Sequence, residues 1–129
     1  MLTEKRRRGN AGEDFAAKIL TEKGYEIIER NFNTRLGEID IVARKDNILA
    51  FVEVKARAEG CMYAPRSAVT ISKQRKICKA AMLYCMKKGF EGQPRFDVFE
   101  AILSKDGTGV REYTYIENAF GTEAVNGFF

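Results

Sequence analysis

Three charged residues interrupt two apolar segments in a way that suggests metal chemistry. Asp40 lies inside the segment EIDIVA, and Glu53 and Lys55 lie inside the segment FVEVKA. Burying an unpaired charge is costly, so charges at half-buried strand positions need a compensating partner. Two neighbouring carboxylates make a hard-oxygen site that suits Mg²⁺ or Mn²⁺. A lysine beside them can position or deprotonate a water, or stabilise a charged transition state.

A β-hairpin would bring these charges together. If residues 46–47 form a two-residue loop, counting back along the strands places Asp40 opposite Glu53 and Glu38 opposite Lys55. Opposed side chains share one face of a sheet at close range, and like charges there are destabilising. We therefore expect Asp40 and Glu53 to hold a divalent cation, with Lys55 beside them.

The alternative is a solvated face that carries a surface charge network. The opposite face of the hairpin is apolar, with Ile39, Ile41, Ala50, Val52 and Val54. The charged face also carries Val42, Leu49 and Phe51, which a fully solvated face would not need. This mixed composition favours the metal site over the charge network.

The elements that position these residues follow from apolar periodicity and from helix start and stop signals. We expect a helix over 10–23, begun by Asn10 and ended by Gly24, and a second helix over 72–88, ended by Gly89. The expected strands span 25–32, 38–44, 48–58, 95–103 and 110–117. The order αβββαββ predicts an α/β fold with a mixed five-stranded sheet flanked by helices. The length suits a single domain over 1–129.

Composition narrows the possible chemistry. The 129 residues include no histidine, which excludes Ser-His-Asp triads and the commonest zinc ligand. The three cysteines lack CxxC spacing, so we expect neither a disulfide framework nor a zinc site. No apolar run reaches the ~20 residues that a membrane span needs. The basic residues near the N-terminus are not followed by the apolar segment of a secretory signal, so we expect no such signal. We expect a cytoplasmic protein without membrane contact.

The spacing of Asp40 and Glu53-Val54-Lys55 resembles the PD-(D/E)xK nuclease motif, with Ile39 in place of the leading proline. The whole chain is similar to the small bacterial YraN-like family of Holliday-junction-resolvase-like proteins. The matching stretches are GNAGEDFA, ERNFNTRLGEIDIVA, FVEVKAR, SKQRK, RFDVFEA and IENAF. The resemblance implies a restriction-endonuclease-like fold and Mg²⁺-dependent phosphodiester hydrolysis in structured or branched DNA. It also raises the possibility of a homodimer, as in two-fold resolvases.

The resemblance adds two candidate catalytic residues, one on each helix. Similar proteins place a glutamate near the metal, which points to Glu13; its alternative role is a capping box with Asn10. Similar proteins also bring a Gln or Lys of the second helix to the active site. Gln74 is the first choice, Lys73 is the adjacent alternative, and a surface glutamine at a frayed helix end is the bland alternative.

The second helix is also the expected nucleic-acid surface, because it carries six basic residues and no acidic one. The predicted backbone contacts are Lys73, Arg75, Lys76, Lys79, Arg57 and Arg30. Such contacts give affinity that falls with salt. Arg6 to Arg8 form either a DNA-binding arm or a disordered basic terminus. Asp97 is expected to bond to backbone or to Arg95.

Three functions remain open from sequence. The first is a metal-dependent endonuclease acting on structured or branched DNA. The second is a nucleic-acid-binding module that keeps the fold without turnover. The third is a protein-interaction domain in which the charges form a plain network. The metal motif and the basic helix together favour the nuclease.

Overall fold

The computed structural model describes residues 4–60, 69–90, 92–106 and 109–127. Its elements follow the order α1 (Glu4–Glu22), β1 (Glu26–Asn33), β2 (Glu38–Lys45), β3 (Ile48–Ala58), α2 (Ile71–Lys88), β4 (Gln93–Leu103), β5 (Val110–Phe120) and a 3₁₀ turn η1 (Glu123–Val125). The expected order αβββαββ is confirmed, and η1 adds a short turn in the C-terminal tail.

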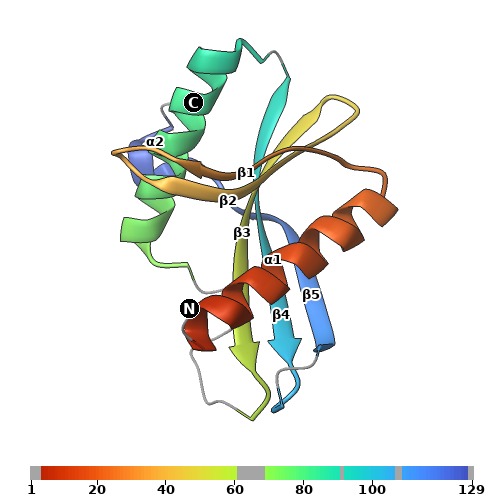
Figure 1. The fold of residues 1–129 in the computed structure, drawn as a ribbon. Coiled ribbons are helices and arrows are strands. Elements are labelled where there is room, and N and C mark those ends of the chain that lie inside the picture. Colours follow the sequence, from red (N-terminus) through yellow and green to blue (C-terminus); the bar gives the residue numbers. More distant parts are fainter. Residues whose placement is uncertain (1–3, 61–68, 91, 107–108, 128–129) are drawn as a thin grey trace.

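The five strands form one mixed sheet in the order β1-β2-β3-β4-β5. β3 and β4 are parallel and are joined through α2, while the other neighbours are antiparallel. Figure 1 shows α1 lying across β3 and β4, with α2 beside the β1–β2 hairpin. The sheet is therefore a middle layer between two helices, as a restriction-endonuclease-like α/β fold requires.

The hairpin between β2 and β3 has the predicted loop. Lys45 pairs with Ile48, and Asp46 adopts a left-handed φ of 54°. Aspartate tolerates this conformation better than most residues, which is why the pair Asp46-Asn47 can close a two-residue loop.

Helix α1 begins six residues earlier than predicted. It starts at Glu4, so Asn10 lies inside the helix and cannot be its N-cap. Arg6 and Arg7 are helical and exposed, which overturns the expectation of a disordered basic terminus. Gly12 lies so close to the sheet that a Cβ atom there would meet the Cβ of Ala56 at 2.7 Å. The helix thus packs on the sheet through a glycine contact.

Helix α2 has well-formed ends. The hydroxyl of Thr70 accepts a hydrogen bond from the backbone N–H of Lys73 at 3.1 Å, which is an N-cap. Gly89 ends the helix in the left-handed conformation, as predicted. The loop before β2 approaches this helix closely: a Cβ on Gly37 would lie 2.3 Å from the carbonyl oxygen of Lys76.

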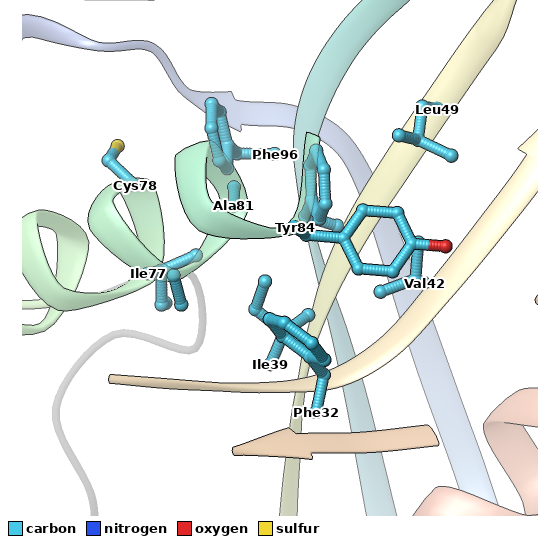
Figure 2. Close-up of a cluster of buried hydrophobic side chains, with 11 residues drawn as sticks. Phe32, Ile39, Val42, Leu49, Ile77, Cys78, Ala81, Tyr84 and Phe96 are labelled. Carbon is cyan, nitrogen blue, oxygen red and sulfur yellow. The ribbon is translucent and has the colours of Figure 1, made fainter. Parts of the chain in front are cut away.

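Each face of the sheet has its own buried cluster. The cluster beneath α1 contains Ala16, Leu20, Tyr25, Ile41, Ala43, Ala50, Val52, Phe99 and Ala101. The cluster beneath α2 includes Phe32, Ile39, Val42, Leu49, Phe51, Ile77, Cys78, Tyr84 and Phe96. Figure 2 shows Tyr84 of α2 beside Phe32 and Val42 of the β1–β2 hairpin, with Ile77 on the side of Ile39. The two clusters hold the sheet, including the β1–β2 hairpin, between the two helices.

Asp97 is a structural residue, as predicted. It is fully buried, and its carboxylate accepts hydrogen bonds from Arg95 at 2.8 and 2.9 Å and from the backbone N–H of Asn118 at 2.9 Å. The hydroxyl of Tyr115 donates to the same carboxylate. This network joins β4 to β5 and is fully hydrogen-bonded.

Two of the cysteines are described, and both are free. Cys78 is buried, and burial raises the pKa of its thiol to about 11; Cys85 is partly buried. Both therefore behave as small apolar residues, whereas Cys61 lies outside the described residues. Among the described helices, none is long and apolar enough to cross a membrane.

Candidate metal and nucleic-acid site

The candidate site lies where β2 separates from β3. The pairing between these strands runs from the hairpin loop to Ile41 and Val52 and ends there. β3 continues to Ala58, paired along its length with β4. Figure 1 shows β3 and β4 extending well beyond the β1–β2 hairpin. This fork removes backbone partners from both strands, and Asp40 is the first residue of β2 beyond it.

The carboxylate of Asp40 bridges the fork. Its Oδ2 atom accepts a hydrogen bond of 2.7 Å from the backbone N–H of Val54, which has no β2 ladder partner beyond the fork. Burial and the neighbouring Glu53 carboxylate raise the pKa of Asp40 to about 8, although the Val54 N–H and Lys73 act in the opposite direction. The carboxyl groups of Asp40 and Glu53 are thus close enough to interact through a hydrogen bond, and their role as metal ligands stays a prediction.

Three details of the predicted hairpin are wrong at the fork. Asp40 does not oppose Glu53 in the strand ladder, which ends before them, and only their side chains meet. Glu38 does not oppose Lys55; it pairs with Asn33 on β1. Ile39 does not join Ile41 beneath α1 but packs in the cluster beneath α2. The reason is that β2 leaves β3 at Asp40, so the strict two-residue alternation of a paired strand is not maintained across this residue.

Asn31 occupies the position of β1 that faces Asp40. Its neighbours Arg30 and Phe32 pair with Ile41 and Ile39, and Asn31 itself has a left-handed φ of 55°. Asparagine is among the few residues that adopt this conformation readily. The break in strand geometry therefore affects both strands at the level of Asp40.

Glu13 reaches the site from α1. Its Oε1 atom accepts hydrogen bonds from Arg30 Nε at 3.1 Å and from Asn31 Nδ2 at 2.9 Å. Burial and the nearby Asp40 raise the pKa of Glu13, while the bonds from Arg30 and Asn31 oppose that shift. The expected capping box with Asn10 is wrong, because α1 begins earlier. The structure instead places Glu13 beside Asp40, where the family resemblance expected it.

The residue of α2 that contacts the carboxylates is Lys73. Its Nζ atom lies 3.6 Å from Glu53 Oε2, and Glu53 keeps only 11% of its side chain exposed. Gln74 instead donates from its amide to the backbone carbonyl of Val69 at 2.9 Å. Of the two α2 candidates, the geometry thus brings the alternative, Lys73, to the predicted metal ligands.

Lys55 lies two residues beyond Glu53 on β3 and is half-buried. In the parallel register with β4 its partner is Glu100, which is 3% exposed. Partners in a sheet share a face, so Glu100 joins the charged face of β3. Arg57 completes the group, with its Nη2 atom 3.4 Å from Glu100 Oε2. This face of β3 and β4 thus carries acidic and basic groups side by side.

The residues that were predicted to bind the nucleic-acid backbone fall into two groups, according to whether they contact other protein atoms. Lys76 and Lys79 are exposed on α2. The others contact protein atoms: Arg30 binds Glu13 and Asp14, Lys73 and Arg57 bind carboxylates, and Arg75 Nε donates to the carbonyl of Ala124 at 3.3 Å. Of the predicted residues, Lys76 and Lys79 are therefore the exposed ones whose side chains form no ion pair or hydrogen bond within the described part of the chain.

The carboxylates of the site suit a hard divalent cation that takes only one or two ligands from the protein. The described part of the chain holds no group of three His, Cys, Asp or Glu side chains close enough to bind one ion. Mg²⁺ commonly uses one or two carboxylates and completes its shell with waters and substrate phosphate. Asp40 and Glu53 could supply such a pair, and a bound cation would offset the repulsion by Glu53 that helps to raise the pKa of Asp40.

Comparison with known proteins places the chain in a family. The model described as "Uncharacterised protein family UPF0102" matches residues 12–100. The chain belongs to this family. The match spans every candidate from Glu13 to Glu100. It confirms the YraN-like resemblance and adds no activity.

Relatives in this family match over most of their length. A UPF0102 protein of Caldanaerobacter subterraneus is 42% identical over 113 residues, covering 87% of this chain and 93% of the relative. One of Clostridium perfringens is 43% identical, with 87% and 92% covered. One of Symbiobacterium thermophilum is 46% identical, with 89% and 97% covered. The similarity to these relatives therefore extends over most of the chain described above.

Sequence reasoning missed Glu100, and it gave Asn31 only as a residue that lines a nucleic-acid groove together with Arg30 and Arg57. Glu100 interrupts the apolar strand RFDVFEA as Glu53 interrupts its own, so the same argument could have selected it. Asn31 gave a weaker signal, because only its left-handed backbone and its bond to Glu13 bring it into the site. Both depend on which strands are neighbours, which spacing alone does not specify.

Proposed function

We propose that the protein is a metal-dependent endonuclease that hydrolyses phosphodiester bonds in structured or branched DNA. The observation that carries the proposal is the pairing of Asp40 with Glu53 at the fork, where the pKa of Asp40 is raised to about 8. Two carboxylates held together at such a cost to ionisation are typical of catalytic and metal sites. Family membership supports the domain type and leaves the activity as a proposal.

Each residue has a role that follows from its position. Asp40 and Glu53 would hold Mg²⁺ or Mn²⁺. The bound ion would supply an activated water and neutralise charge on the phosphate. Val54 fixes the Asp40 carboxylate through its backbone N–H. Lys73, near Glu53, and Lys55, on the face with Glu100, would stabilise the negative charge that develops on the attacked phosphate.

The second candidate is a nucleic-acid-binding module without turnover. It is favoured by the absence of a three-ligand group among the residues the structure describes, and by the exposure of Lys76 and Lys79. In that case the carboxylates would hold a proton rather than an ion. A homodimer remains a prediction for either function.

The decisive experiment is cleavage of a DNA panel (junction, flap, single strand and duplex) with Mg²⁺ or Mn²⁺. Wild type is compared with Asp40→Asn and Glu53→Gln, which keep side-chain shape and remove charge. Glu26→Gln is the matched control, because Glu26 is an exposed carboxylate at the far end of β1. We expect both site variants to lose cleavage and the control to keep it. Cleavage that survives both site substitutions would refute the assignment.

Binding measurements separate the two candidates. An inactive protein that binds DNA in a salt-dependent manner, without cutting any member of the panel, would establish the binding module. Isothermal titration with Mn²⁺ adds a readout independent of activity: the nuclease should bind the ion, and Asp40→Asn should weaken that binding at least tenfold.

A further inference from the structure

A polar hollow of about 390 Å³ opens beside Asp40, and Lys73 is not among its lining residues. Arg6 and Asn10 of α1 line one wall, and Asn31 and Asn33 of β1 line another. Glu38, Ile39 and Asp40 of β2 complete it. The volume falls in the lower part of the ~300–1,000 Å³ range of small-molecule pockets. The candidate chemistry described above uses only Asp40 from this hollow.

The earlier start of α1 creates this site. Arg6 and Asn10 are four residues apart and Glu13 follows three residues later, so all three lie on one helix face. Glu13 anchors that face to β1 through Arg30 and Asn31. The first turns of α1 are thereby held against the β1–β2 hairpin.

The lining matches a nucleotide better than a simple anion. A carboxamide such as that of Asn10 both donates and accepts hydrogen bonds, so it can pair in bidentate fashion with the polar edge of a base. Carboxylates such as Glu38 accept from exocyclic amino groups but repel a bare phosphate. Arg6 supplies the cation for a phosphate, and Ile39 supplies an apolar surface for the base.

We infer that the hollow binds one unpaired nucleotide of the substrate, with its base among the asparagine side chains and its phosphate toward Arg6. This inference rests on the proposed function and narrows it. A base can present its full pairing edge only when it is out of a duplex. The substrate class is therefore DNA with an unpaired nucleotide beside the cut, such as a flap, an overhang or an open junction.

The test uses the full chain in EDTA, so that binding is measured without cleavage. Fluorescence anisotropy compares a labelled blunt duplex with the same duplex carrying an unpaired tail. Wild type should prefer the tailed DNA by on the order of tenfold, the discrimination expected of a bidentate contact. The double variant Asn10→Ala/Asn33→Ala should lose most of this preference. Both side chains are exposed, so the fold should survive, and circular dichroism checks it.

Arg7→Ala is the matched control for Arg6→Ala, because Arg7 is an exposed neighbour on α1 that does not line the hollow. Arg6→Ala should reduce the affinity for tailed DNA severalfold. Arg7→Ala should keep the preference of wild type for tailed DNA over the blunt duplex. Deoxyadenosine monophosphate should compete better than inorganic phosphate. Equal wild-type affinity for both DNAs, a preference that survives in the folded double variant, or equal competition by phosphate would overturn the inference.

The two proposals fail separately. A protein that prefers tailed DNA in EDTA but cleaves nothing keeps the nucleotide site and loses the nuclease. A protein that cleaves blunt and tailed DNA equally, with no binding preference, keeps the nuclease and loses the nucleotide site.

Discussion

Replacing Asp40 by Asn should reveal the electrostatic cost of the site. Asparagine keeps an oxygen that can accept the Val54 N–H bond and removes the charge that faces Glu53. The pKa of Asp40 is raised from 3.8 to about 8 by burial and by Glu53. In the metal-free protein, Asp40 is therefore largely protonated at neutral pH, and the variant resembles that state.

The sign of the pH effect follows from the raised pKa. Between pH 4 and about 8 the folded protein holds a proton on Asp40 that the unfolded chain has lost. The associated stability is fully present below pH 3.8 and is lost as the pH rises through about 8. Four pKa units correspond to a ceiling of about 5–6 kcal/mol. Because Asp40 interacts with the neighbouring Glu53 carboxylate, the loss should stay below this ceiling, and we expect about 2–3 kcal/mol between pH 5 and pH 9.

The assay is urea unfolding in EDTA at several pH values, monitored by circular dichroism. The difference between wild type and Asp40→Asn cancels the titration of groups that do not interact with Asp40, which leaves the site itself with the neighbouring Glu53 and Glu13. Wild type should lose stability toward pH 9 relative to the variant, so that the variant is the more stable at pH 9. Asp14→Asn, at a carboxylate that is 71% exposed, should give a curve parallel to wild type.

Parallel curves for wild type and Asp40→Asn would refute the reasoning, because they would mean that Asp40 carries no unusual proton. A second arm adds Mn²⁺. Binding an ion displaces the proton from Asp40, so the affinity of wild type for Mn²⁺ should rise with pH until about pH 8 and then level off.

Three further predictions concern packing, the buried network and DNA contact. Gly9→Ala and Gly12→Ala should have opposite effects in thermal unfolding: Gly9 faces open space and should gain about 0.5–1 kcal/mol of helix stability, whereas Gly12 has a Cβ position 2.7 Å from the sheet and should lose about 1–3 kcal/mol. Asp97→Ala should cost about 3–5 kcal/mol in urea unfolding, because it removes a fully buried carboxylate that accepts hydrogen bonds from Arg95, Tyr115 and the backbone N–H of Asn118; a loss under 1 kcal/mol would contradict this. Lys76→Gln and Lys79→Gln should each make the negative slope of log K for binding duplex DNA against log[salt] less steep by about one. Unchanged slopes would mean that the DNA binds elsewhere.

The local parts of the fold were predictable because short-range chemistry determines them. The strand 48–58 has the predicted bounds, and the 46–47 loop has the predicted register. Gly89 ends α2 where glycine was expected to end it. Each of these features depends on residues that are neighbours along the chain.

The parts that failed depend on distant segments. The residues 4–8 favour a helix by propensity, but they carry no apolar stripe, so periodicity gave no sign that the helix begins before Asn10. β2 separates from β3 at Asp40, although the pattern of apolar and charged residues in both segments continues past that point. Spacing therefore identified Asp40 and Glu53 and misplaced Glu38.

The fork also explains why the site residues cannot be judged by alanine substitution alone. Where two strands separate, a backbone N–H loses its partner and must be satisfied in another way. The Asp40 carboxylate satisfies the N–H of Val54 and at the same time repels Glu53. Asp40→Ala would remove both effects and could unfold the fork, whereas Asp40→Asn removes only the repulsion. Loss of metal binding in a stabilised Asp40→Asn protein would then have a chemical cause rather than a structural one.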